Sequence, residues 1–65
     1  MKFADWLFEQ LERDDYVGDL ARRVEGDDLF PDSGNRAIYE GYFETFDAEV
    51  QAQFDRVWDA WEAEA

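Results

Sequence analysis

The sequence predicts an all-α fold, a small bundle of four short helices with tight connectors. Three observations favour this fold class. Apolar residues recur at helical spacing, and no segment of useful length alternates as a strand does. Aromatic residues make up 18% of the 65 residues, which gives so short a chain large side chains for its core. A chain of 65 residues also corresponds to one domain, residues 1–65, and it contains no linker and no internal repeat.

The first helix is expected from Lys2 to Arg13. Its inward face consists of apolar residues at helical spacing, with Phe8 at the flank of that face. These residues are Phe3, Trp6, Leu7 and Leu11. Asp14 and Asp15 then interrupt the pattern, and either side chain is an N-cap candidate for the second helix because a carboxylate accepts hydrogen bonds from free backbone N–H groups.

The second helix is short and is expected from Val17 to Glu25. Arg22 and Arg23 lie near its C-terminal end, where a positive charge suits the helix dipole. Gly26 follows and favours termination of the helix there. The apolar stripe of this helix comprises Val17, Leu20, Ala21 and Val24.

Residues 27–35 are expected to form a connector between the second and third helices. Pro31 favours an extended conformation for Phe30, which precedes it. The apolar pair Leu29 and Phe30 has two interpretations: a plug that packs over the bundle, or an anchor that a partner protein binds. The plug is the favoured interpretation.

The third helix is expected from Arg36 to Glu44. Gly41 falls on the side of this helix that faces away from the aromatic residues, where a glycine costs about 1 kcal/mol relative to alanine. Close approach of another backbone is one explanation for this glycine. The apolar residues of this segment cluster on one side when plotted at helical spacing: Ile38, Tyr39, Tyr42, Phe43 and Phe46.

The last helix shows the clearest amphipathic pattern in the chain. Asp47 is its expected N-cap, and Glu49 lies in its first turn. Its apolar stripe comprises Val50, Phe54, Val57, Trp58 and Trp61. Its outer face carries Asp55, Arg56 and Asp59. Glu62 and Glu64 lie at the C-terminal end, which the helix dipole disfavours, so fraying is expected there.

Four segments follow one another along the chain: Phe3 with Trp6 and Leu7; Gly18, Asp19, Leu20 and Ala21; Asp28, Leu29, Phe30 and Pro31; and Phe54 and Asp55 with Trp58 and Trp61. In this order they resemble the YozE-type family of small bacterial proteins with a SAM-like (sterile alpha motif-like) fold. The resemblance covers nearly the whole chain and implies one SAM-like bundle of four to five short helices. It implies a mainly structural role for these residues and no catalytic activity, because the family is functionally uncharacterised. The chain departs from the family in its greater acidity and in Trp61, where a tyrosine-type aromatic is usual, and neither departure threatens the fold.

The net charge of the chain restricts the classes of molecule that it can bind. It carries 18 acidic and 6 basic residues, a net charge of −12. This balance argues against nucleic acid as a direct ligand and against an anionic membrane surface, because both require clustered Lys and Arg. A basic protein partner is permitted. A solvated surface suited to a salt-rich cytoplasm or a GC-rich genome is the main explanation for the acid excess.

No catalytic, cofactor-binding or metal-binding residue is assigned. The chain lacks His and Cys, and it contains one serine, Ser33, and one threonine, Thr45, as candidate nucleophiles. The carboxylate pairs, at Asp14 with Asp15 and at Asp27 with Asp28, are better explained by helix capping and solvation than by glycoside hydrolysis. The oxygen ligands of the connector do not match an EF-hand spacing; they are Asp27, Asp28, Asp32 and Asn35. We therefore expect a protein that is not an enzyme and has no cofactor.

The cellular context is expected to be the cytoplasm. The sequence shows no signal peptide and no apolar segment that approaches the length of a membrane span. The absence of Cys fits this compartment. We expect a monomer or a weak dimer.

Two functions remain after these exclusions. The first is a protein–protein interaction module that presents a helical face, with an aromatic residue such as Phe8 or Trp58 partly exposed and rimmed by acids. The alternative is an acidic nucleic-acid mimic that inhibits a DNA-binding protein by occupying its basic groove. Mimicry requires carboxylates along one ridge, whereas this sequence spreads them through every helix and connector.

Overall fold

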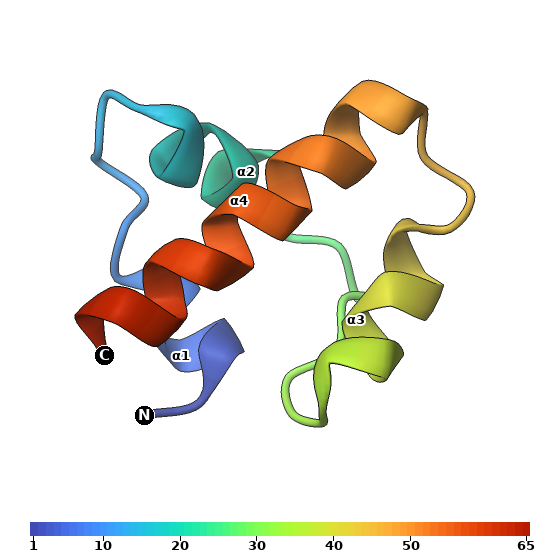
Figure 1. Ribbon diagram of the computed structural model, residues 1–65, viewed down its shortest axis with the longest axis horizontal. Helices are drawn as coiled ribbons and strands as arrows, with labels where there is room; N and C mark the ends of the chain where they lie inside the picture. Colours follow the sequence, from blue (N-terminus) through green and yellow to red (C-terminus); the bar gives the residue numbers. More distant parts are fainter.

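The computed structural model describes all 65 residues, and it contains helices and no strands. The helices are α1 (Phe3–Phe8), α2 (Tyr16–Val24), α3 (Arg36–Phe43) and α4 (Ala48–Glu64). The all-α class and the number of four helices are confirmed. The longest helix, α4, runs diagonally across the molecule and packs against each of the other three (Figure 1). None of the four helices combines the length and the apolar character that crossing a bilayer requires.

One continuous aromatic core joins the helices. Phe3 of α1 lies at its centre, with ring centroids 5.0 Å from Tyr39 of α3 and 4.9 Å from Trp58 of α4. Phe43 and Phe54 stack at 4.8 Å and join α3 to α4. Such ring pairs stabilise a core beyond the area that they bury, so the aromatic residues compensate for the small size of the domain.

The first helix is shorter than the sequence predicts, because α1 ends at Phe8 and the expected helix to Arg13 is wrong. After Phe8 the backbone forms four-residue turns, in which the N–H of Gln10 donates to the carbonyl of Leu7 and the N–H of Arg13 to that of Gln10. These turns bend the chain back so that the carbonyl of Arg13 lies against Gly18 of α2.

The second helix begins at its predicted cap. The Asp15 carboxylate accepts hydrogen bonds from the N–H groups of Val17 (3.0 Å) and Gly18 (3.3 Å), and α2 therefore starts at Tyr16, one residue before the expected position. Gly26 follows the helix with a φ of +82°, a conformation that glycine adopts without a steric penalty. The predicted terminator is confirmed.

The third helix differs from its prediction at two residues, Ile38 and Gly41. Ile38 is 52% exposed instead of buried, because it packs beside Gly34 at the start of α3 and not on the core. Gly41 faces open space, so the proposed close approach of another backbone at this residue is wrong. The N-cap of α3 is Asn35, whose side chain accepts a hydrogen bond from the N–H of Ile38 (3.2 Å).

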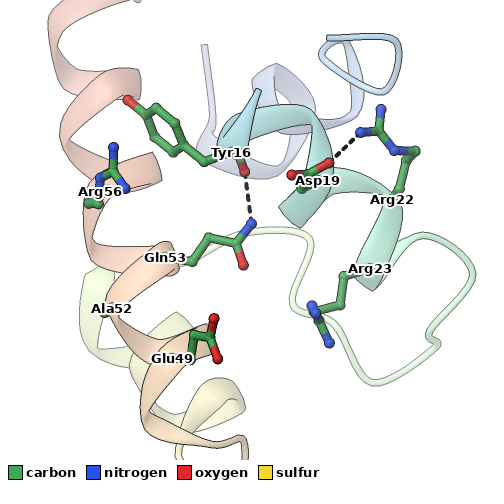
Figure 2. A pocket seen from close by; sticks show the side chains of 8 residues that line it. All are labelled: Tyr16, Asp19, Arg22, Arg23, Glu49, Ala52, Gln53 and Arg56. Carbon is green, nitrogen blue, oxygen red and sulfur yellow. Dashed lines mark hydrogen bonds and ion pairs between the residues drawn. The ribbon is translucent and has the colours of Figure 1, made fainter. Parts of the chain in front are cut away.

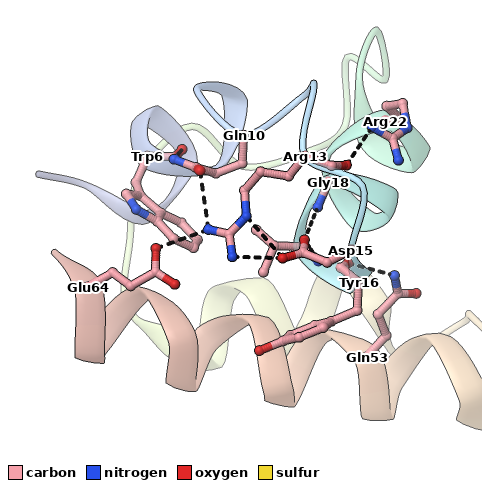
Figure 3. Close-up of polar contacts among 10 residues, drawn as sticks. Trp6, Gln10, Arg13, Asp15, Tyr16, Gly18, Arg22, Gln53 and Glu64 are labelled. Atoms are coloured by element: carbon pink, nitrogen blue, oxygen red, sulfur yellow. Dashed lines mark hydrogen bonds and ion pairs between the residues drawn. The ribbon is translucent and has the colours of Figure 1, made fainter.

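The fourth helix begins after Asp47 as predicted, because this carboxylate accepts a hydrogen bond from the N–H of Val50 (3.0 Å). The predicted stripe is buried, apart from the half-buried Trp61. The helix continues to Glu64 instead of fraying at its acidic end. The Arg13 guanidinium explains this difference, since it forms an ion pair of 3.0 Å with the Glu64 carboxylate and neutralises an acid at the end of α4 (Figure 3).

Candidate functional site

Most of the residues that carry the family resemblance lie in the core. The buried members are Phe3, Trp6, Leu7, Gly18, Leu20, Ala21, Phe30, Phe54 and Trp58. Gly18 is required by packing, because a Cβ atom at this position would lie 2.0 Å from the carbonyl oxygen of Arg13. Pro31 and Trp61 are half-buried at the edge of the core.

The acidic members of the same set lie on the surface. Asp19 forms an ion pair of 2.6 Å with Arg22, and Asp55 forms one of 2.9 Å with Arg36. Asp28 is exposed beside Leu29. The structure therefore does not bring the acidic residues of the family pattern together into one site.

Leu29 and Phe30 have opposite environments. Phe30 is only 8% exposed, and its ring packs against Tyr39 and Tyr42 of α3. Leu29 is 82% exposed. The two interpretations of this pair thus separate: Phe30 is the plug, and Leu29 is the exposed apolar residue that the anchor interpretation requires.

The Leu29 turn, residues 27–31, is held by three hydrogen bonds to Asp27. The Asp27 carboxylate accepts from the N–H of Leu29 (2.9 Å) and from the hydroxyl group of Tyr42, and the Asp27 carbonyl accepts from the N–H of Phe30 (3.0 Å). The Asp27 side chain therefore ties the turn to α3. Leu29 lies on a fixed turn and not on a loose loop.

The pKa values of Asp27 and Tyr42 agree with the hydrogen bond between these two side chains. The Tyr42 hydroxyl, and then the N–H of Leu29, hold the pKa of Asp27 below its ordinary value. Burial, and then the hydrogen bond to Asp27, raise the pKa of Tyr42 to about 12. The carboxylate and the neutral phenol thus stabilise each other across the neutral pH range.

The surroundings of the Leu29 turn are partly apolar and partly acidic. The ring of Phe8, which is 37% exposed, packs on Phe30 at a centroid distance of 5.6 Å. Asp27, Asp28 and Asp32 are exposed within or beside the turn. An exposed apolar residue with an acidic rim fits a protein surface that has an apolar pocket and basic residues around it.

A second feature of the surface is the α2–α4 groove, an open groove of about 830 Å³ between these two helices (Figure 2). Its lining includes Arg22, Arg23 and Arg56, half of the six basic residues of the chain. From the sequence, Arg22 and Arg23 were expected to serve the dipole of α2, and Arg56 to lie on the outer face of α4. That these arginines share a groove was not predicted. No local signal reveals this, because the groove exists only once α2 packs on α4.

The side chains that could act as nucleophiles or as metal ligands lie apart from one another. Ser33 and Thr45 are both exposed, in separate connectors. No cluster of three or more acidic side chains converges in a way that could hold a metal ion.

Comparison with known protein families agrees with this architecture. A family described as having the YozE SAM-like fold matches residues 3–63. No curated protein and no solved structure matches the sequence. The family match covers nearly the whole chain, from α1 to the last turn of α4. The chain therefore belongs to the YozE SAM-like family.

Proposed function

We propose that this domain is a non-catalytic protein-interaction module that acts in the bacterial cytoplasm as a monomer or weak dimer. The Leu29 turn is its binding anchor. The observation that carries the proposal is an exposed leucine on a turn fixed by three hydrogen bonds. The partner is a protein with an apolar pocket for Leu29 and basic residues around that pocket.

The rigidity of the turn distinguishes Leu29 from an ordinary exposed leucine. Single apolar side chains on a surface are common and need no explanation. A turn whose backbone is already ordered loses less conformational entropy when it binds, so an anchor on such a turn gains affinity. Asp27 and Tyr42 provide this order from within the domain.

The charge supports a basic partner. The net charge of −12 accelerates association with a protein of opposite charge, and the acids beside Leu29 select basic residues at the contact. The lack of His and Cys supports a role without catalysis. Nucleic-acid mimicry has less support, because Arg36 pairs with Asp55 and approaches Asp59 on the outer face of α4 and so interrupts an acidic ridge.

Photo-cross-linking in cells tests the proposal. A photoreactive amino acid replaces Leu29 in one variant and the exposed Glu62 of α4 in a control variant. The expected result is a discrete cross-linked protein with the probe at position 29 and not at position 62. Equal products at both positions, or no product at position 29, would contradict the role of the turn.

A further inference from the structure

A third feature of the surface is the α3–α4 groove, a hollow of about 450 Å³ between these two helices. Phe43 of α3 and Phe54 of α4 line it, and their rings stack on each other at a centroid distance of 4.8 Å. Ala37 and Gly41, one helical turn apart, add little bulk to the α3 wall. The groove therefore has an aromatic base and room for a side chain that comes from outside the domain.

Gly41 is the residue of this groove that the fold does not explain. A glycine inside a helix is destabilising relative to alanine. A Cβ atom at position 41 would meet no atom within 4 Å, and the φ of Gly41 is not positive, so neither packing nor backbone conformation requires glycine there. The missing side chain instead keeps this wall of the groove open to a group from another molecule.

The walls of the groove already hold one basic side chain of the domain itself. The Arg36 guanidinium forms ion pairs with Glu40 (3.3 Å) and Asp55 (2.9 Å), both of which line the groove. It also lies 6.0 Å from the centroid of the Phe54 ring. Glu44, the third acidic residue of the groove, lies one turn beyond Glu40 and forms no ion pair. The chemistry that holds Arg36 at one end of the groove is thus present again at the other.

We propose that the α3–α4 groove binds one long basic side chain, a lysine or an arginine, of a partner protein. The stem of this side chain lies along Ala37 and Gly41, and its charged end lies at Glu44. Lysine and arginine suit such a groove because their methylene stems pack on apolar surface while the charged end stays solvated. The groove shares no residue with the Leu29 turn, so this inference stands independently of the anchor proposed above.

Other occupants fit the groove less well. A metal ion finds no three acidic side chains that converge on one point. An acidic or phosphate group meets repulsion from Glu40, Glu44 and Asp55. A second copy of the chain brings a further charge of −12, which opposes self-association. A long basic side chain matches both the small, apolar wall and the carboxylates.

Nuclear magnetic resonance on the full chain tests this site. The probes are capped Gly-Gly-Lys-Gly-Gly and Gly-Gly-Arg-Gly-Gly, and the control is the matching citrulline peptide, which keeps the shape of arginine without its charge. Sodium chloride at about 0.15 M screens diffuse attraction beyond about 8 Å. The expected result is a saturable shift of the amide signals of Gly41 and Glu44 with the two basic peptides only. The signal of Asp28, an exposed acid outside the groove, should stay in place.

Variants of the groove complete the test. Gly41→Leu fills the groove and should abolish saturable binding, and since leucine is a better helix former than glycine, a lost helix would not explain that result. Glu44→Gln removes one charge and should weaken binding by roughly threefold, as expected for an exposed ion pair. Glu62→Gln removes the same charge outside the groove and should leave the affinity unchanged. Thermal melting confirms that each variant is folded.

Three outcomes would overturn the inference. Shifts of equal size at Asp28 and Glu44 would show diffuse attraction to an acidic surface, and no saturable shift in the millimolar range would show no site. Unchanged binding by Gly41→Leu would place the peptide outside the groove. None of these outcomes depends on Leu29, whose role is tested by the cross-linking described above.

Discussion

Gly18 and Gly41 both lie inside helices, but only Gly18 has a packing reason. The backbone of Arg13 crosses α2 at Gly18 so closely that a methyl group at this position would overlap the Arg13 carbonyl. Gly41 faces open space on α3. The sequence pattern offered close approach only as one explanation for Gly41 and gave no sign of it at Gly18, because a crossing between distant segments leaves no periodic signal.

Alanine substitutions at the two glycines should have opposite effects on the free energy of unfolding. Gly41→Ala should raise it by about 0.5–1 kcal/mol, since alanine is the better helix former and meets no neighbour. Gly18→Ala should lower it by about 1–3 kcal/mol, the usual cost of overpacking. Urea denaturation measures both values, and a Gly18→Ala variant as stable as Gly41→Ala would show that the crossing is misplaced.

The Tyr42 hydroxyl should make the stability of the domain sensitive to alkali. The pKa of Tyr42 rises from 10.0 to about 12 on folding, mainly through burial and then through the hydrogen bond to Asp27. A raised pKa means that the neutral phenol stabilises the folded state below pH 10.0, and that this contribution is lost as the pH rises toward 12. The difference in unfolding free energy between wild type and Tyr42→Phe should shrink over this interval. A difference that stays constant would contradict the Tyr42–Asp27 contact.

At the scale of the helices, the sequence predicts best what local signals determine. Asp15 and Asp47 cap α2 and α4 as expected, because an N-cap and an apolar stripe lie within a few residues of each other. The end of α1 was predicted wrongly, since it depends on where the chain must turn to cross Gly18. The groove arginines Arg23 and Arg56 come from different helices, and only their packing brings them together.

Alanine substitutions at the two caps should differ in their effect on the free energy of unfolding. Asp47→Ala should cost about 1 kcal/mol, the typical value for a lost N-cap. Asp15→Ala should cost more, because the same carboxylate also pairs with Arg13 at 2.8 Å (Figure 3). The Arg13 hydrogen bond, and then the N–H groups of α2, lower the pKa of Asp15 below its ordinary value of 3.8.

The sign of the acid effect follows from this shift. A lowered pKa means that the Asp15 carboxylate stabilises the folded state above pH 3.8, and that its contribution is lost as the pH falls through the lower folded value. The stability difference between wild type and Asp15→Ala should therefore be full at neutral pH and shrink below pH 3.8. Urea denaturation at a series of pH values checks this, and an undiminished difference in acid would contradict the ion pair.

At the scale of the whole molecule, the acidic residues lie outside the core, and few basic residues offset their charge. Three arginines engage acidic side chains, and each does so at the surface: Arg13, Arg22 and Arg36. Most of the 18 acidic residues have no cation beside them. Mutual repulsion among these carboxylates opposes compaction, and exposed ion pairs offset little of it.

Salt should therefore stabilise this domain. Added sodium chloride screens charges beyond about 8 Å near 0.15 M, which weakens the long-range repulsion more than the short ion pairs. The midpoint of thermal unfolding should rise with salt at neutral pH. A midpoint that falls with salt would show that the ion pairs outweigh the repulsion.

The central claim, that Leu29 serves binding and not folding, is tested most directly by quantitative capture of the protein that cross-links at position 29. Wild type, Leu29→Ser and Ile38→Ser serve as baits, since Ile38 is also an exposed apolar residue but lies outside the turn. Leu29→Ser should reduce recovery by about tenfold, as expected for an anchor residue, and leave the urea midpoint unchanged. Ile38→Ser should retain the partner. Equal recovery with Leu29→Ser and wild type would contradict the claim.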